Sequence, residues 1–208
     1  MNIKGYLIVL ACIICQVCTA QNREIKDKEL ASLVEVVKGL RHSTEASYKK
    51  ALQALTADDH WVTMSETGNL QKTECKPQAK TPSFKLNRIL YAAEKERKYV
   101  STKTEMLNGE DSRYNYSLFE RILKKGKSAT YHLRKRKGKQ TIVLVPHVAK
   151  KGSLGVLIDG KKPTTTEDED GTLTCTFNAT GKEFALTTTN KSGSALSFVI
   201  LNHNSRKK

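Results

Sequence analysis

The hydrophobic pattern of the chain changes once, from a helical repeat to a strand repeat. Within residues 21–57, apolar side chains recur every three or four positions with charged residues between them, as in amphipathic helices. The apolar positions of this stripe are Leu30, Leu33, Val37 and Leu40. Ser43 and Thr44 are both good N-cap residues, so a second helix is expected to begin there. The pattern therefore predicts an N-terminal helical segment, either two helices or one broken helix.

From residue 58 onward, runs of β-branched and aromatic residues are separated by turn signals such as Asn108-Gly109. The predicted strands cover residues 60–65, 71–79, 85–92, 99–106, 114–123, 129–136, 141–148, 154–159, 172–177, 183–189 and 195–201. The run 114–123 also suits a helix, and residues 162–171 have the pattern of an irregular loop. We therefore predict a mainly β protein with N-terminal helices. Residues 58–208 would form an antiparallel β-barrel or, alternatively, a β-sandwich, in one globular unit with the helices.

Residues 1–20 have the pattern of a signal peptide. A lysine supplies the positive start, residues 6–14 form an apolar core too short for a membrane span, and residues 18–20 are small, as at a cleavage site. Residues 9–12 also resemble a bacterial lipobox, although the later residues give the better cleavage site. No second long apolar stretch follows. We therefore expect a secreted, extracellular protein with no transmembrane segment, whose mature chain begins at Gln21.

Two cysteines, Cys75 and Cys175, are left once the leader is removed. In an exported chain an even number of cysteines indicates disulfide bonding, and a bond closing this loop would stabilise the fold by about 4–5 kcal/mol. Such a bond would hold the beginning of the β region to its end. The alternative is a pair of buried free thiols.

Three asparagines, Asn115, Asn178 and Asn190, are each followed two positions later by serine or threonine. In a secreted chain this is the acceptor sequence for N-linked glycosylation, which places the asparagine on the surface. Chance occurrence in a chain rich in serine and threonine is the alternative, and we expect it to explain at least one of the three.

The mature chain is strongly basic, with 35 basic against 21 acidic residues and a net charge of +14 after the leader's single lysine is removed. Such a charge favours anionic partners, and secretion makes nucleic acid an unexpected one. The densest basic run comprises Lys124, Lys125, Lys127, Arg134, Lys135, Arg136, Lys137 and Lys139. If residues 129–136 and 141–148 form a hairpin, these charges gather near its turn at Gly138 and form an anion-binding patch. The alternative is a solvated turn that favours solubility.

The stretch from Tyr48 to Cys75 resembles the lipocalins of blood-feeding arthropods. The matching pieces are a short helix at 48–52, a first strand with an aromatic residue at 58–62, and the cysteine that ends residues 73–75. The Gly-x-Trp signature of typical lipocalins is absent, because Asp59 and His60 precede the tryptophan. The resemblance implies a barrel that holds a small ligand. In such a barrel the ligand-pocket candidates are Trp61, Tyr99, Tyr114 and Tyr116, although aromatic residues at strand spacing are more often simply core.

No motif of a catalytic or metal site is found: the five histidines are scattered, and no Gly-x-Ser-x-Gly or His-Glu-x-x-His sequence occurs. We therefore predict a non-enzymatic binding protein without cofactor or metal, holding a small hydrophobic or amphipathic ligand in a barrel. The alternative is a basic interaction protein that binds glycosaminoglycan or an acidic protein surface through the 124–139 hairpin. A third hypothesis is a cytokine-like or structural factor whose N-terminal helices mediate assembly. The sequence leaves the oligomeric state open.

Overall fold

The computed structural model describes residues 28–42, 44–55, 62–65, 71–76, 81–89, 100–101, 116–134 and 138–203. The chain divides into two units, Met1–Ala31 and Ser32–Lys208. Of the first unit only residues 28–31 are described, so the account below concerns the second. The predicted signal peptide lies outside the described residues. Within the described part of the chain, no helix has the length and apolar character needed to cross a membrane.

The N-terminal segment is helical, as predicted. It comprises α2 (Lys28–Gly39), the 3-10 turn η2 (Leu40–His42) and α3 (Glu45–Leu55). Thr44 is the N-cap of α3, because its Oγ1 accepts a hydrogen bond from the Ser47 amide at 3.1 Å. Leu33, Val37 and Leu40 of the predicted apolar stripe are buried.

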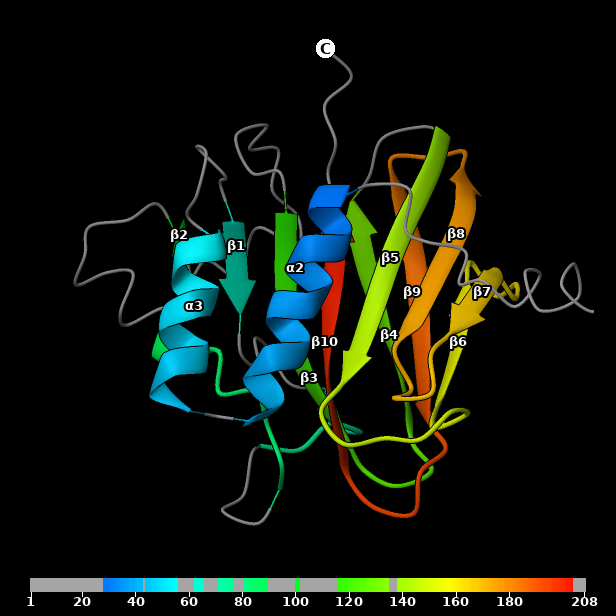
Figure 1. The fold of residues 1–208 in the computed structure, drawn as a ribbon. Helices are drawn as coiled ribbons and strands as arrows, with labels where there is room; N and C mark the ends of the chain where they lie inside the picture. Colours follow the sequence, from blue (N-terminus) through cyan, green and yellow to red (C-terminus); the bar gives the residue numbers. More distant parts are fainter. Residues whose placement is uncertain are drawn as a thin grey trace, which may run out of the picture. The chain divides into compact units, whose positions relative to one another are not determined.

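The described residues contain ten strands in two sheets, most of them antiparallel, which confirms the mainly antiparallel β fold with a few helices (Figure 1). The strands are β1 (Val62–Ser65), β2 (Val100–Ser101), β3 (Tyr116–Leu123), β4 (Ser128–Arg134), β5 (Gly138–Pro146), β6 (Leu154–Ile158), β7 (Thr164–Glu167), β8 (Leu173–Ala179), β9 (Glu183–Asn190) and β10 (Leu196–His203). The larger sheet has the order β2-β1-β3-β10-β5-β8-β7 and the smaller one β4-β9-β6. Among these strands, the pairs β1–β2 and β1–β3 are parallel and the others antiparallel. No closed barrel is found among the described strands.

The two sheets share a hydrophobic core. Side chains of β3, β5 and β10 in the larger sheet, such as Phe119, Ile142 and Phe198, pack in one cluster with Tyr131, Leu186 and other residues of the smaller sheet. Fully burying an aliphatic or aromatic side chain contributes roughly 1.5–3 kcal/mol. This cluster therefore supplies the main force that holds the sheets together.

The opposite face of the larger sheet is also buried. Its side chains include Leu118, Ile122, Val143, Val145, Val199 and Leu201, all at most 1% exposed. Phe84 links this face to α3, because its carbonyl accepts a hydrogen bond from the Tyr48 hydroxyl at 2.8 Å and its amide donates one to Glu120 Oε1 at 2.7 Å. Burial on both faces explains why residues 114–123 matched a helix as well as a strand: a doubly buried strand loses the alternation of apolar and polar residues.

Three predicted elements differ from the structure. The segment 71–76 of the predicted strand 71–79 is a turn with one isolated bridge, Glu74 to Leu123. The described part of 85–92 contains a short helical turn instead of a strand. Conversely, β7 lies within the predicted irregular loop 162–171. Its threonines favour a strand through β-branching, but the segment carries no hydrophobic alternation to reveal it.

The basic hairpin is also corrected. β4 pairs with β9 in the smaller sheet, whereas β5 pairs with β8 and β10 in the larger one. Consecutive strands of a β protein usually pair, but here the chain changes sheet between β4 and β5, so no hairpin turn forms at Gly138. The residues 135–137 of this connection lie outside the described ones.

The predicted disulfide is absent from the structure, where Cys75 and Cys175 are both free thiols. Cys75 borders β3, because its amide donates to the Ile122 carbonyl at 3.0 Å, whereas Cys175 lies on β8. β3, β10 and β5 stand between them in the sheet, a separation of about 19 Å at the usual strand spacing. A disulfide requires Cα atoms closer than about 7 Å. Burial raises the pKa of the Cys175 thiol to about 12, as in an unreactive structural cysteine.

Candidate anion-binding end

The turn between β3 and β4 carries three exposed lysines, Lys124, Lys125 and Lys127. It is closed by a hydrogen bond from the Lys127 amide to the Lys124 carbonyl at 3.1 Å. Gly126 within the turn has φ +68°, a left-handed conformation that glycine adopts without steric cost. The three ammonium groups therefore project from a tight, well-defined turn.

Asn190, the last residue of β9, joins this turn to the next one. Its amide donates to the Lys127 carbonyl at 2.9 Å, and its carbonyl accepts from the Gly126 amide at 3.0 Å. Its side-chain Nδ2 donates to the Leu123 carbonyl at 3.0 Å and to the Ser194 carbonyl at 2.8 Å. Asn190 is fully buried, so a polar side chain fixes the β3–β4 turn against the β9–β10 turn.

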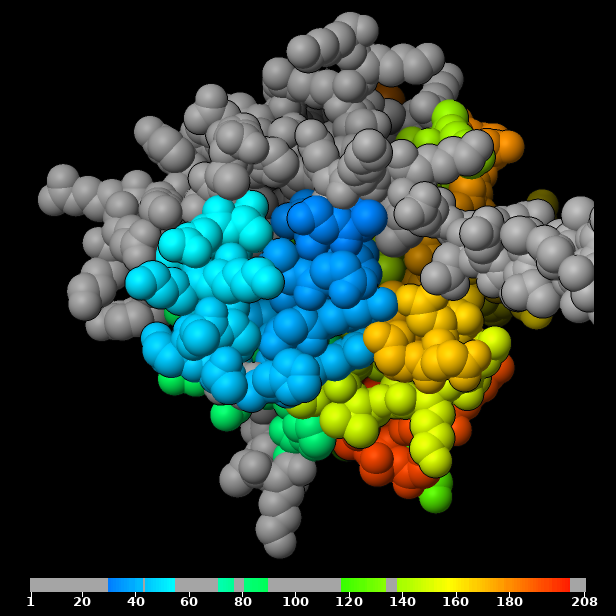
Figure 2. Space-filling view, viewed as in Figure 1, coloured from blue at the N-terminus to red at the C-terminus, as the bar shows by residue number. Residues whose placement is uncertain are grey.

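Two further segments meet the same turns. The Lys124 amide donates to the Thr73 carbonyl at 3.4 Å, which places residues 71–76 beside the β3–β4 turn. The Lys191 amide donates to the Ser153 carbonyl at 2.9 Å, which places the β5–β6 loop beside the β9–β10 turn. Four segments that are distant in sequence are thus joined by backbone hydrogen bonds. The β3–β4, β5–β6 and β9–β10 connections gather at the lower end of the β strands in Figure 1, and Figure 2 shows the parts near residues 150 and 190 together on the surface.

Eight exposed lysines lie on these four segments, and we call them the lysine end. They are Lys72, Lys76, Lys124, Lys125, Lys127, Lys150, Lys151 and Lys191. The acidic run 167–170 borders the β5–β6 part of this end, where Lys151 forms a 3.6 Å ion pair with Glu169, a side chain that is 94% exposed. Glu167 accepts a hydrogen bond from the Gly152 amide. An exposed ion pair contributes little and is screened by salt, so the lysine end keeps a strong positive charge.

The fourth segment is held in place by the buried carboxylate of Glu74. Oε1 accepts a hydrogen bond from the Tyr131 hydroxyl at 2.7 Å, and Oε2 accepts one from the Gln71 amide at 3.0 Å. The Arg121 guanidinium lies 3.9 Å from Oε1. Burial, followed by the nearby Glu74 charge, raises the pKa of Tyr131 far above its usual range, so the hydroxyl remains a hydrogen-bond donor. This network anchors residues 71–76 to both sheets.

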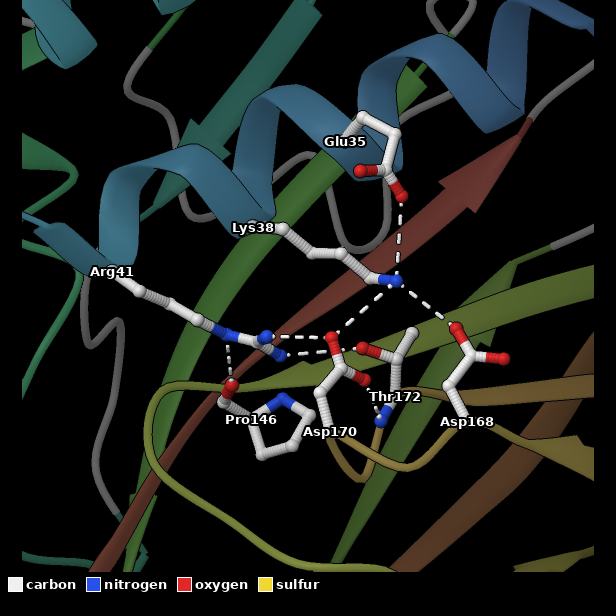
Figure 3. Close-up of polar contacts among 7 residues, drawn as sticks. All are labelled: Glu35, Lys38, Arg41, Pro146, Asp168, Asp170 and Thr172. Carbon is white, nitrogen blue, oxygen red and sulfur yellow. Dashed lines mark hydrogen bonds and ion pairs between the residues drawn. The ribbon is translucent and has the colours of Figure 1, made fainter.

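In a second charged cluster, basic side chains of the helical segment form ion pairs with acidic residues (Figure 3). Lys38 Nζ lies 3.0 Å from Asp168 Oδ2, and Arg41 Nη1 donates to Asp170 Oδ2 at 2.7 Å while its Nη2 donates to Thr172 Oγ1 at 3.2 Å. Burial alone would raise the pKa of Asp170, but the hydrogen bonds from Arg41 and Thr172 outweigh it and hold the pKa well below its usual range. The acidic run thus ties α2 and η2 to the β8 side of the larger sheet.

The predicted basic patch is divided between the two ends of β4. Lys124, Lys125 and Lys127 precede the strand, whereas Arg134 ends it and Lys139 is the second residue of β5. Lys135, Arg136 and Lys137 lie outside the described residues. A seven-residue strand spans about 20 Å, so the run does not form one patch. Lys72, Lys76, Lys150, Lys151 and Lys191 were not predicted, because only the tertiary structure brings them to the β3–β4 turn.

The other predicted site residues fall as follows. Trp61, Tyr99 and Tyr114 lie outside the described residues, and so does the side chain of Tyr116 in β3. Asn115 also lies outside them, Asn178 is exposed on β8, and Asn190 is buried. Within the described residues, no group of three or more His, Cys, Asp or Glu side chains is placed to hold a metal ion.

Comparisons with protein-family models, curated proteins and solved structures find no match to the chain. The resemblance to lipocalins of blood-feeding arthropods therefore stays a prediction.

Proposed function

We propose that the chain is a secreted, non-enzymatic binding protein that holds a polyanion, specifically a sulfated glycosaminoglycan chain, against its lysine end. The observation that carries this proposal is the convergence of eight exposed lysines from four segments joined by backbone hydrogen bonds. Clustered cations on fixed turns attract sulfate groups at long range and lose little conformational freedom in the backbone when they bind.

A glycosaminoglycan suits this surface better than a compact acidic ligand. The lysines lie on separate turns at one end of the β strands, so they present an extended set of point charges. Lysine ammonium groups are strongly hydrated and not geometrically demanding, which fits repeated sulfate groups along a flexible chain. The predicted signal peptide places the protein outside the cell, where sulfated glycans are abundant polyanions.

We also propose that the two sheets form a β-sandwich instead of a barrel. Within the described part of the chain, the larger sheet ends in β2 and β7 and the smaller one in β4 and β6, with a shared core between the sheets. That core is filled by side chains of both sheets. A small-ligand function in a barrel therefore ranks below polyanion binding, because the side chains that fill this core leave the sheets packed against each other.

Affinity chromatography on immobilised heparin tests the proposal. In the end variant, glutamine replaces Lys124, Lys125 and Lys127. In the control variant, glutamine replaces Lys139, Lys161 and Lys182, which are exposed and lie outside the lysine end. Both variants have the same net charge. Each lysine near an anionic surface contributes about 1 kcal/mol, so the end variant should bind heparin about a hundredfold more weakly and elute at much lower salt. The control variant should elute close to the unsubstituted protein.

Equal losses in the two variants would mean that heparin responds to net charge alone, and the lysine end would then not be the site. If the end variant elutes at the same salt concentration as the unsubstituted protein, the lysine end is also rejected as the heparin site. Because the substituted side chains are exposed, we expect both variants to keep the fold. Circular dichroism of each variant verifies this.

A further inference from the structure

The acceptor sequence for N-linked glycosylation occurs at two described asparagines, and the structure gives them opposite environments. At Asn190 the side-chain nitrogen donates to two carbonyls, of Leu123 and Ser194. Its Oδ1 accepts from the Ser192 amide at 2.8 Å and from the Ser192 hydroxyl at 2.6 Å. The residue is 0% exposed. A glycan is attached through this same nitrogen and needs solvent around it, so the folded protein has no room for a sugar at Asn190.

Asn178 is exposed near the end of β8. Thr180, which follows the strand, is also exposed, while Ala179 between them is buried. The residue paired with Asn178 is Lys139, which is also exposed. β7 pairs with β8 only as far as Thr176, so within the described strands nothing borders β8 at Asn178 on that side.

We propose that Asn178 carries an N-linked glycan and that Asn190 does not. In this reaction the Nδ2 atom of Asn178 forms a bond to C1 of an oligosaccharide supplied by a polyprenyl-pyrophosphate donor. The C1–O bond to the pyrophosphate breaks, the lipid pyrophosphate leaves, and the amide nitrogen gives up one proton. Asn190 and Ser192 instead form hydrogen bonds with each other that stabilise the turn joining the lysine-bearing segments.

The position of the glycan has a consequence for the rest of the molecule. Asn178 lies five positions along the strand from Leu173, which begins β8 on the side of the lysine end, a distance of about 17 Å. A glycan at Asn178 therefore leaves the lysine end open. The inference does not depend on the proposed function: heparin binding and occupancy of Asn178 are measured separately, and each result stands without the other.

Glycopeptide mass spectrometry of the full chain, secreted from cultured animal cells with its own leader, tests the proposal. The peptide containing Asn178 should carry an oligosaccharide that peptide-N-glycosidase releases, and the peptide containing Asn190 should be unmodified. In an Asn115→Gln background, Asn178→Gln should remove the mass of one oligosaccharide from the secreted protein, and Asn190→Gln should remove none.

Because Asn190→Gln removes buried hydrogen bonds and lowers the secreted yield, the map of the unsubstituted protein decides the question. A sugar on Asn190, an unmodified Asn178 in the secreted protein, or a chain that accumulates in cells without any glycan would each overturn the proposal.

Discussion

At the scale of single residues, the environment decides what a motif does. Asn178 and Asn190 carry the same acceptor pattern, yet one is exposed and the other is fully buried. The buried one uses its side-chain oxygen and nitrogen for four hydrogen bonds within the protein. A linear pattern cannot distinguish the two, because the difference lies in the carbonyls that the fold brings to Asn190.

We predict that Asn190→Ala lowers the free energy of unfolding by about 2–4 kcal/mol, because the substitution removes four hydrogen bonds and leaves the Leu123 and Ser194 carbonyls without these donors. Asn178→Ala is the matched control, since replacing that exposed side chain should change the free energy of unfolding by less than about 0.5 kcal/mol. Urea unfolding followed by circular dichroism, on unglycosylated protein, measures both. Equal stability of the two variants would show that Asn190 does not organise the turns.

At the scale of elements, the sequence predicted the strands better than their partners. The helical segment, the Thr44 cap and most strands from β3 onward match the pattern of the chain. The hairpin between β4 and β5 and the cysteine pair were wrong, because both depend on which strands lie next to each other. That choice is made by packing between faces: β3 and β5 are buried on both sides and take central positions in the larger sheet.

The site was predictable only in part for the same reason. The pattern marks Lys124, Lys125 and Lys127 as a basic turn, but no spacing in the sequence connects them to Lys72, Lys150 or Lys191. These residues meet through the hydrogen bonds that Thr73, Ser153 and Asn190 make with neighbouring turns.

The geometry of the β3–β4 turn leads to a prediction about glycine. An added Cβ meets nothing within 4 Å at either Gly126 or Gly39, so only backbone conformation separates the two positions. Gly126 has φ +68° and Gly39 ends helix α2. We expect Gly126→Ala to destabilise the protein by about 1 kcal/mol and Gly39→Ala to stabilise it by about 0.5–1 kcal/mol. Chemical denaturation of the pair measures both signs, and a neutral Gly126→Ala would mean that the turn adopts another conformation in solution.

At the scale of the whole molecule, the charge is unevenly used. The net charge of +15 at neutral pH lowers stability through self-repulsion and favours association with anions. Some cations are neutralised inside the protein: Lys38 and Arg41 bind Asp168 and Asp170 and so attach the helical segment to the larger sheet. The lysines of the lysine end are exposed. The same composition thus serves internal cohesion and, in the proposed function, attraction to a polyanion.

The ion pairs that Asp170 forms with Lys38 and Arg41 predict a contribution to stability that is lost in acid. Because the pKa of Asp170 in the folded protein is held below its unfolded value of about 3.9, its charged form stabilises the fold above that value. This contribution is lost as the pH falls from about 4 toward the folded pKa. The stability difference between the unsubstituted protein and Asp170→Asn should therefore be largest near neutral pH and shrink below pH 4. Glu169→Gln, at a side chain that is 94% exposed, is the control and should change the free energy of unfolding by less than about 0.5 kcal/mol when urea unfolding is measured from about pH 7 to 2. A difference for Asp170→Asn that stays constant over this range would contradict the role assigned to its carboxylate.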